Sequence, residues 1–423
     1  MKLATPEKVQ KLRTALYERA KREPRLRFYS LYDKVYRTDV LAHAYALCRA
    51  NKGAAGPDGI TFEDIEHGGG PASMLARLAE ELTTRQYKPG PVRRVYLPKA
   101  NGGERPLGIP DIRDRVVAMA VKLVLEPIFE AEFDADSYGF RPGRDAHQAL
   151  AAIRESVTAG MVWIVDGDVS KCFDTIPHDR LLRTVASRVA DGSLLALLKH
   201  FLTAPVVDER DGGRRTRPRA GTPQGGPASP LLANIYLHLL DRNFRRHVER
   251  GELQGRLVRY ADDMLLLCPR SPTREHAWAA HMIARLGLTL HPDKTRVVHV
   301  HKEWVNFLGY RIRRRPSGRV AFDISPKAMS RIRNTLRDTT RRTFLSQEAL
   351  ISDLTVYIRG AGAYFRLAEP RTLWNLDRFD LARIARWARH KRVRRLPEWS
   401  LARGMSLYRE HGLATWWHRG QPT

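Results

Sequence analysis

The sequence is poor in cysteine and has no long apolar run. Its three cysteines, Cys48, Cys172 and Cys268, are far apart and form no Cys-x-x-Cys pair. This spacing argues against a zinc site and against a disulfide framework, and it suits a reducing cytoplasm. No segment approaches the roughly 18 apolar residues of a membrane-spanning helix, and the charged N-terminus lacks the apolar core of a signal peptide. We therefore expect neither zinc nor a membrane, and a location in the bacterial cytoplasm, associated with the nucleoid.

Acidic residues are scarce relative to basic ones. The 423 residues include 73 Lys and Arg against 46 Asp and Glu, which gives a net charge of +27. An excess of this size predicts a polyanionic partner, most simply nucleic acid. A membrane-surface protein and a basic enzyme from a thermophile are the alternatives. Because 43% of the residues are hydrophobic, the chain can bury a sizeable core, and its length suits two or three domains.

The composition changes along the chain. A glycine-proline loop, 53–59, follows an N-terminal segment with a helical pattern, and the pattern is helical again from Ser325 onward. A long helix is expected over 113–133, interrupted near Pro127. Between Arg311 and Arg342 there are eleven basic residues and two acidic ones. We predict three regions: an N-terminal helical extension (1–52), a mixed region (53–310) and a helical region (311–423).

Two carboxylates lie at the tip of an apolar hairpin. Residues 257–268 predict two short strands joined near Asp262 and Asp263, and Asp168 lies in a second apolar run, 161–169. A solvated turn and a helix N-cap are the ordinary explanations of these patterns. The functional explanation is a metal site, because a cation between the acids would relieve their repulsion. Two-metal phosphoryl transfer needs carboxylates that hold ions about 3.5–4 Å apart, and oxygen ligands suit Mg²⁺.

An ordered series of segments resembles the motifs of reverse transcriptases. They are LPKANGGERPLGIPDIRDRVV (97–117) and SYGFRPGRDAHQAL (137–150) of the fingers, VDGDVSKCFDTI (165–176), TPQGGPASPLLANIYLHLLD (222–241) and YADD (260–263) as motifs A, B and C, GLTLHPDKT (287–295) as the next palm motif, and NFLGY (306–310) as the primer grip. A lone YxDD is weak evidence, whereas the complete order is specific. The resemblance implies an RNA-directed DNA polymerase in which Asp168, Asp262 and Asp263 are catalytic. These three and Val169 would hold two Mg²⁺ ions.

The resemblance also implies a fold and a nucleotide site. The fold is α+β, a right-hand polymerase whose fingers and palm contain an antiparallel sheet packed on helices, followed by an all-helical thumb and maturase domain. Lys99 and Arg105 would clamp the triphosphate of a deoxynucleotide. Phe173 would exclude a ribose 2′-hydroxyl, and Gln224 and Gly225 would approach the incoming base or the template. The ordinary explanations are a basic hairpin, a core phenylalanine and a plain loop.

The remaining segments resemble group II intron proteins. GAAGPDGIT (53–61) is similar to their N-terminal block, while 350–366 and 375–392 are similar to their maturase segment, with Gly360-Ala361 in place of the usual Gly-Trp pair. The partners implied are a group II intron RNA template, a DNA primer or target and deoxynucleoside triphosphates. The protein would assist splicing of the RNA and copy it during retrohoming. The sequence ends without the HNH-type endonuclease motif, so the resemblance is to the endonuclease-lacking type.

Basic and aromatic residues predict the RNA surface. Aromatic side chains that alternate with the basic residues of the C-terminal region suit base stacking, and a helix-bundle core is the alternative. Arg144, Lys171 and Arg259 approach phosphates or carboxylates, and the sequence does not separate these roles. The residues predicted to bind nucleic acid are Arg141, Arg311, Arg313, Arg314, Arg331, Arg386, Arg389 and Lys391.

Three other functions remain open. A domesticated group II-like enzyme acting in DNA repair or phage defence would share the palm and differ in genomic context. A splicing factor with an inactive polymerase fold would lack a catalytic carboxylate, and all three are present. An RNA-dependent RNA polymerase is disfavoured by Phe173, and comparing deoxynucleotide with ribonucleotide incorporation would decide.

Overall fold

The computed structural model of the protein divides into two compact units. Residues 3–98, 103–223, 225–390 and 412–416 are described. The first unit comprises Met1–Ile153 and Val165–Arg296, and the second comprises Arg154–Ile164 and Val297–Thr423. The domain limits expected after residues 52 and 310 stay predictions. No helix within the described residues has the length and apolarity needed to cross a membrane.

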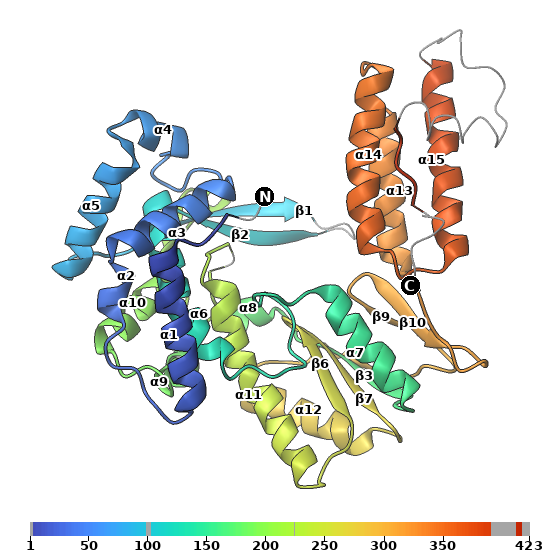
Figure 1. The fold of residues 1–423 in the computed structure, drawn as a ribbon, viewed down its shortest axis with the longest axis horizontal. Helices are drawn as coiled ribbons and strands as arrows, with labels where there is room; N and C mark the ends of the chain where they lie inside the picture. Colours follow the sequence, from blue (N-terminus) through green and yellow to red (C-terminus); the bar gives the residue numbers. More distant parts are fainter. Residues whose placement is uncertain (1–2, 99–102, 224, 391–411, 417–423) are drawn as a thin grey trace. The chain divides into compact units, whose positions relative to one another are not determined.

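Helices form the N-terminal part of the first unit. They are α1 (Glu7–Arg22), α2 (Tyr32–Val35), α3 (Thr38–Ala50), α4 (Phe62–His67), α5 (Gly70–Thr83) and α6 (Ile112–Glu130). In α1 the buried residues are Val9, Leu16 and Ala20, whose spacing places them on one face. That face packs on α6, and α3 packs there too, so the nearly fully buried α6 is the centre of this part (Figure 1).

Helix α6 runs without interruption through Pro127, contrary to the sequence-based expectation of a break. A proline leaves the carbonyl four residues earlier without its helical partner. Here that carbonyl belongs to Leu123, and it accepts a hydrogen bond from the Arg13 guanidinium at 3.4 Å. Arg13 also pairs with Glu126 at 2.7 Å. Side chains of α1 therefore satisfy the group that the proline leaves free, and the helix continues to Glu130.

Four strands form a sheet beside these helices. They are β1 (Val92–Pro98), β2 (Glu104–Pro110), β4 (Val206–Asp208) and β5 (Arg214–Thr216), in the order β2-β1-β4-β5. β1 and β2 are antiparallel, with Val92 opposite Pro110, while β1 and β4 are parallel. The basic segment 206–216 forms a hairpin of β4 and β5, joined by the short 3-10 helix η1 (Glu209–Asp211).

A second sheet carries the carboxylates singled out in the sequence. Its strands are β3 (Trp163–Asp168), β6 (Arg256–Tyr260), β7 (Asp263–Cys268) and β8 (Arg296–His299), in the order β6-β7-β3-β8. The helices of this region are α7 (Ala146–Thr158), α8 (Cys172–Thr175), α9 (His178–Ala186), α10 (Gly192–Leu202), α11 (Ser229–Glu249) and α12 (Thr273–Arg285). Helix α11 carries side chains that bond to β6, and it contacts α12 through Trp278, whose indole donates to Asn243 at 3.1 Å. Mixed helix and sheet confirm the expected α+β class.

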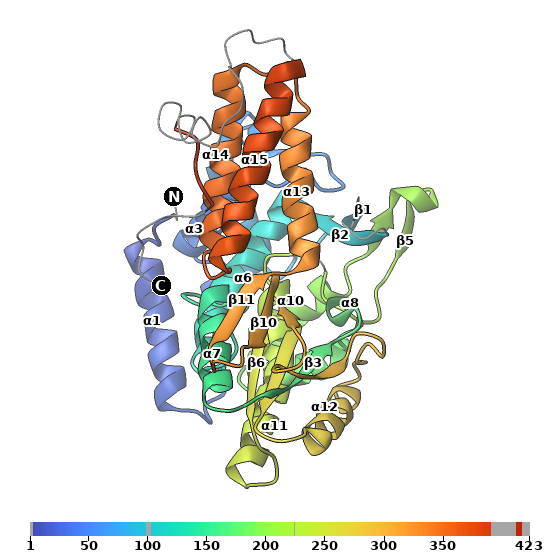
Figure 2. The same cartoon turned by 90° about the vertical axis from the view of Figure 1, so that its right-hand side faces the viewer.

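The second unit consists of a small sheet and a helical bundle. The antiparallel strands β9 (Val305–Phe307), β10 (Tyr310–Arg314) and β11 (Val320–Ile324) precede α13 (Pro326–Thr340), α14 (Gln347–Tyr364) and α15 (Pro370–His390). The three helices lie side by side in both views (Figure 1, Figure 2). Ser325 and Ser346 cap α13 and α14 by accepting from backbone N–H groups in their first turns. Residues 311–324 lie largely in β10 and β11, and the helices begin just after Ser325, where the helical pattern of the sequence begins.

Residues 412–416 close the bundle by packing on α14 and α15. Trp416 is fully buried, and its backbone N–H donates to Asp377 at 2.8 Å. Its indole N–H donates to Asp380, and its ring meets Tyr357 edge to face. Burial raises the pKa of Asp380 well above its ordinary value, and the bond from Trp416 opposes this increase. One tryptophan therefore fills the core and donates hydrogen bonds to two acids.

Replacing this tryptophan should weaken the bundle. Trp416→Ala removes a fully buried ring and the donor to Asp380, so we expect the free energy of unfolding to fall by about 3–5 kcal/mol. Urea unfolding followed by circular dichroism measures the change. Trp374→Ala is the matched control, because Trp374 is 40% exposed and contacts Arg378, a cation-π pair that contributes about 1 kcal/mol or less. Equal losses in the two variants would contradict the assignment of Trp416 to the core.

Candidate active site

The paired acids lie at a two-residue turn. Tyr260 is opposite Asp263 in the register of β6 and β7, which leaves Ala261 and Asp262 as the loop. Short hairpins favour turns whose first loop residue has positive φ, and Ala261 has φ of +58°. In a continuous strand, the adjacent side chains of Asp262 and Asp263 would point to opposite faces of the sheet. The turn removes this restriction. It places Asp262 in the loop and Asp263 at the first position of β7.

The third acid comes from the adjacent strand. β3 lies next to β7, and a Cβ on Gly167 would come within 2.5 Å of the Met264 side chain. Glycine thus allows the two strands to approach closely just before Asp168. The Asp168 carbonyl accepts from the backbone N–H of His291 at 2.7 Å, which fixes the end of β3. Asp168 thus ends a strand that lies next to the strand beginning at Asp263.

The acids disturb one another electrostatically. Burial raises the pKa of Asp262, and the charge of Asp168 adds to the increase. Burial also raises the pKa of Asp263 to about 6, with contributions from the charges of Asp262 and Asp168. Although Asp263 is exposed, the atoms around its carboxylate limit its hydration and so disfavour the charged form. Bringing several carboxylates together without a cation is therefore unfavourable here.

Two basic side chains offset part of this charge. Lys294 pairs with Asp168 at 2.7 Å, and Arg296 approaches Asp166 at 3.4 Å. Burial nevertheless raises the pKa of Asp166 to about 6, against the influence of Arg296. Lys294 lies in the PDKT segment, 292–295, whose motif the sequence reveals, although its pairing with Asp168 was not foreseen. An ammonium group thus lies against the carboxylate expected to bind metal.

The donor set fits hard divalent cations. Asp168, Asp262 and Asp263 supply only oxygen atoms, which Mg²⁺ prefers, and like charges that raise one another's pKa gain from a cation. In the part of the chain that the structure describes, no three His, Cys, Asp or Glu side chains already converge as a ligand set. Metal binding would therefore draw these carboxylates together and compete with the Lys294 ion pair.

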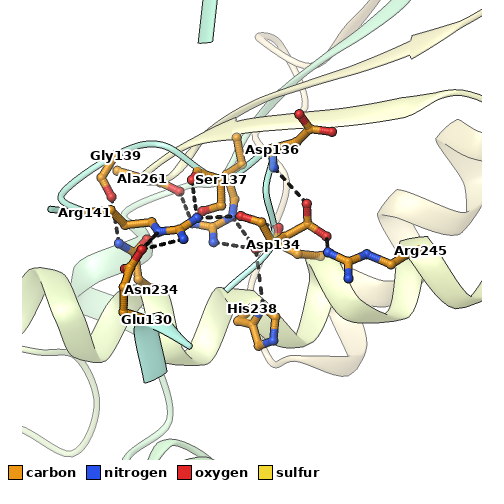
Figure 3. A network of polar contacts seen from close by, with 12 residues as sticks. Glu130, Asp134, Asp136, Ser137, Gly139, Arg141, Asn234, His238, Arg245 and Ala261 are labelled. Atoms are coloured by element: carbon orange, nitrogen blue, oxygen red, sulfur yellow. Dashed lines mark hydrogen bonds and ion pairs between the residues drawn. The ribbon is translucent and has the colours of Figure 1, made fainter. Parts of the chain in front are cut away.

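The buried guanidinium of Arg259 holds the 261–262 turn through hydrogen bonds. Arg259, only 1% exposed on its side chain, pairs with Asp241 of α11 at 2.5 Å. It also donates to the Asn234 amide oxygen at 2.9 Å and to the Ala261 carbonyl at 2.8 Å. The Asn234 amide in turn donates to the Gly139 carbonyl at 2.7 Å (Figure 3). These bonds connect α11, β6, the turn and the segment that contains Gly139.

Arg141 belongs to the same support and does not face nucleic acid. Its buried guanidinium pairs with Glu130 at 2.7 Å and donates to the carbonyls of Asp134 and Ser137, both at 2.5 Å (Figure 3). This finding corrects the expectation that Arg141 contacts nucleic acid, because its donors are occupied inside the protein. The sequence left Arg259 open between phosphates and carboxylates, and its partner is the carboxylate of Asp241.

The predicted nucleotide residues can be placed in part. Arg105, on β2, is close enough to Asp262 to lower the pKa of that carboxyl. Phe173 lies in α8, and the backbone of Gly225 approaches β2 so closely that a Cβ would come within 2.2 Å of the Gly108 carbonyl. Lys99 and Gln224 lie outside the described residues. The turn, the fingers strand and the loop before α11 therefore border one region of the first unit.

The second unit contains the other predicted nucleic-acid contacts. Arg331, Arg386 and Arg389 are exposed on helices α13 and α15. The strand residues are more constrained: Arg311 pairs with Asp323 at 2.7 Å, and Arg313 donates to the His301 carbonyl at 3.2 Å. The remaining two are Arg314, half-buried on β10, and Lys391, outside the described residues.

The aromatic residues of this unit divide into two groups. Trp387 and Phe365 are buried, so the bundle-core alternative is correct for them and the RNA-stacking alternative is wrong. Trp374 is exposed and stacks with Arg378, and it remains a candidate for stacking on bases.

Several supporting residues were not found by sequence reasoning. Asn234 and Asp241 are buried polar residues seven positions apart in a mostly apolar part of α11, so both face the same side of the helix. That spacing is a detectable signal. Their common partner, Arg259, could not be identified without the tertiary fold.

The contact between Gly139 and the turn provides a test. A Cβ at Gly139 would lie 2.3 Å from the Ala261 nitrogen and 2.9 Å from the Tyr260 carbonyl carbon. Since these are backbone atoms, Gly139→Ala should lower the free energy of unfolding by about 1–3 kcal/mol or more. Gly192→Ala is the control, because nothing lies within 4 Å of a Cβ there. Thermal melting of both variants makes the comparison, and equal midpoints would refute the close contact.

Comparison with known families covers both units. The description "Reverse transcriptase (RNA-dependent DNA polymerase)" matches residues 97–312. The description "Group II intron, maturase-specific domain" matches residues 329–404. The first range contains the three acids and their support, and the second contains most of the helical bundle.

Individual relatives agree with these assignments. Protein YkfC of Escherichia coli is 33% identical over 332 residues, covering 70% of this chain and 86% of YkfC. The "Uncharacterized 91 kDa protein in cob intron" of Schizosaccharomyces pombe is 30% identical, covering 70% and 43%. The "Group II intron-encoded protein LtrA" of Lactococcus lactis is 38% identical, covering 51% and 35%. The chain thus spans less than half the length of the last two. It belongs to the reverse transcriptase family and carries a group II intron maturase-specific domain.

Proposed function

We propose that this protein binds a structured group II intron RNA, assists its splicing and copies it into DNA during retrohoming. The observation that supports the polymerase part is that Asp168 ends β3 beside the hairpin turn of Asp262 and Asp263, close enough for its charge to raise the pKa values of both. The maturase-specific match over 329–404 supports the intron part. The partners would be the intron RNA, a DNA primer and deoxynucleoside triphosphates, in a bacterial cytoplasm near the nucleoid.

The carboxylates and the Val169 carbonyl would hold two Mg²⁺ ions. When bound, such a pair activates a primer 3′-hydroxyl and stabilises the charge of the leaving pyrophosphate. Asp168 and Asp262 would be ligands from β3 and from the turn. Lys294, which pairs with Asp168 at 2.7 Å, would exchange this contact when a cation binds.

Other residues would position the substrates. Arg105 lies near Asp262 and would bind the triphosphate as a fork, together with Lys99. The Gly225 backbone would border the nascent base pair, beside Gln224. Phe173, from α8, would exclude a 2′-hydroxyl at the sugar. Arg331, Arg386 and Arg389 of the helical bundle would meet RNA phosphates, because they are exposed.

The domesticated alternative shares every part of this site. It differs in the RNA that the protein carries in its host. Sequencing the RNA that copurifies with the protein distinguishes the two functions: enrichment of a group II intron supports the proposal, and its absence favours a role in repair or defence.

The metal assignment predicts a specific loss. Asp262→Asn keeps the size of the side chain and removes a charge, so we expect DNA synthesis on a primed RNA template to fall by at least about 10³-fold. Affinity for RNA should stay within about twofold, because the turn makes no phosphate contact in this proposal. Mg²⁺ should also raise the melting temperature of the unaltered protein more than that of the variant. Near-normal primer extension by Asp262→Asn would refute the assignment.

The bundle surface predicts a salt-dependent interaction. Arg386 and Arg389 are exposed on α15, so replacing both with Gln should remove up to two phosphate contacts. The slope of log affinity for RNA against log salt should then become shallower by about 1–2. Fluorescence anisotropy with labelled intron RNA at several salt concentrations measures the slope. Arg183→Gln is the control, since Arg183 is exposed but paired with Asp179 on α9 of the first unit. An unchanged slope would exclude this face as an RNA contact.

A further inference from the structure

Phe140 has an unusual backbone and an unusual exposure. Its φ is +58°, in the left-handed region that bulky side chains rarely occupy. Its side chain is also 53% exposed, so core packing does not explain why a phenylalanine is present. A glycine would fit this backbone at lower cost. Such an outlier beside a candidate active site suggests that the ring itself is needed.

The residues around Phe140 are firmly held. The backbone N–H of Tyr138 donates to the Arg259 carbonyl at 2.9 Å, and the Gly139 carbonyl accepts from Asn234 at 2.7 Å. On the other side, Arg141 is anchored to Glu130. The same network that supports the 261–262 turn therefore holds the chain on both sides of Phe140 (Figure 3).

The ring of Phe140 meets the ring of Phe173. Their centroids are 6.3 Å apart and their planes are inclined at 81°, an edge-to-face arrangement. Phe173 is itself anchored, because its carbonyl accepts from the backbone N–H of Thr222 at 2.7 Å. The loop at Gly221 packs against that same carbonyl at 2.8 Å, measured to an added Cβ. Two fixed segments thus present two aromatic rings to each other.

We propose that Phe140 is a positioning residue that sets sugar selectivity by holding the Phe173 ring in place. The inference rests on the proposed role of Phe173 in excluding a ribose 2′-hydroxyl. The Phe173 ring can exclude a ribonucleotide only if it stays in place. A small rotation of the ring would relieve its clash with the 2′-oxygen of the ribose. Contact with the Phe140 ring would oppose that rotation. The discriminated substrates are deoxynucleoside and ribonucleoside triphosphates with the same base.

Single-nucleotide incorporation on a primed RNA template tests the proposal. The readout is the ratio of kcat/KM for a deoxynucleotide to that for the matching ribonucleotide. Phe173→Ala should lower this ratio. Phe140→Ala should lower it by about two- to tenfold, the scale of one edge-to-face aromatic pair, through more efficient use of the ribonucleotide. The kcat for the deoxynucleotide should change less than the ratio. The double variant should be no less selective than Phe173→Ala, because both changes remove one interaction.

Two further variants separate the ring from the backbone. Phe140→Tyr keeps the ring and should keep the ratio. Phe140→Gly suits the left-handed backbone, so it should keep or raise the melting temperature while lowering selectivity. Tyr29→Ala is the control, because Tyr29 is a 73% exposed aromatic residue of the same unit outside the site, and its ratio should be unchanged.

The outcomes distinguish the two proposals. An unchanged ratio in Phe140→Ala, with a lowered ratio in Phe173→Ala, overturns the role of Phe140 and leaves the gate intact. Unchanged ratios in both overturn the gate and the positioning role with it, while Asp262→Asn still tests the polymerase site. An equal loss of efficiency for both sugars in Phe140→Ala and Phe140→Gly would show a merely structural role and overturn the proposal.

Discussion

The buried ion pair between Arg259 and Asp241 is the constraint on which the site depends. Removing two charges from water is costly, and the cost is recovered only when every donor finds a partner. Arg259 meets that condition with Asp241, Asn234 and the Ala261 carbonyl. Because these groups come from a helix and a hairpin, the pair fixes the turn relative to α11. The 137–141 segment is attached through Asn234 and through the backbone of Arg259.

The chain as a whole is strongly basic, whereas its candidate site is acidic. The whole chain carries +27, which favours association with a polyanion, whereas the candidate site gathers Asp166, Asp168, Asp262 and Asp263. Their mutual repulsion appears in the raised pKa values of three of them. Lys294 offsets part of it. A cluster of carboxylates in a chain of high positive charge suits a site that would bind a cation close to a polyanion.

Local patterns predicted the elements that carry the chemistry, and tertiary partners explain the errors. The 257–268 hairpin and the 163–168 strand follow from short apolar runs, whose conformation depends on near neighbours. Arg141 looked like a surface residue of a basic motif, but its partners Glu130 and the Ser137 carbonyl are supplied by the fold. Pro127 looked like a helix break, and an arginine 114 positions earlier makes the continuous helix possible. Distant partners of this kind leave no periodic signal in a sequence.

Backbone strain and function coincide in the first unit. Ala261, Phe140 and Lys171, which precedes α8 and Phe173, all have positive φ without being glycine. Each position would be more favourable as glycine, yet glycine would lose what the side chain or a stiffer backbone provides. At Ala261 a methyl group limits the freedom of the acidic turn, and at Phe140 a ring meets the ring of Phe173. The Arg259 network makes these conformations tolerable, because its bonds hold the adjacent residues on both segments. The buried ion pair between Arg259 and Asp241 thus helps to hold the positive-φ backbone of the site in place.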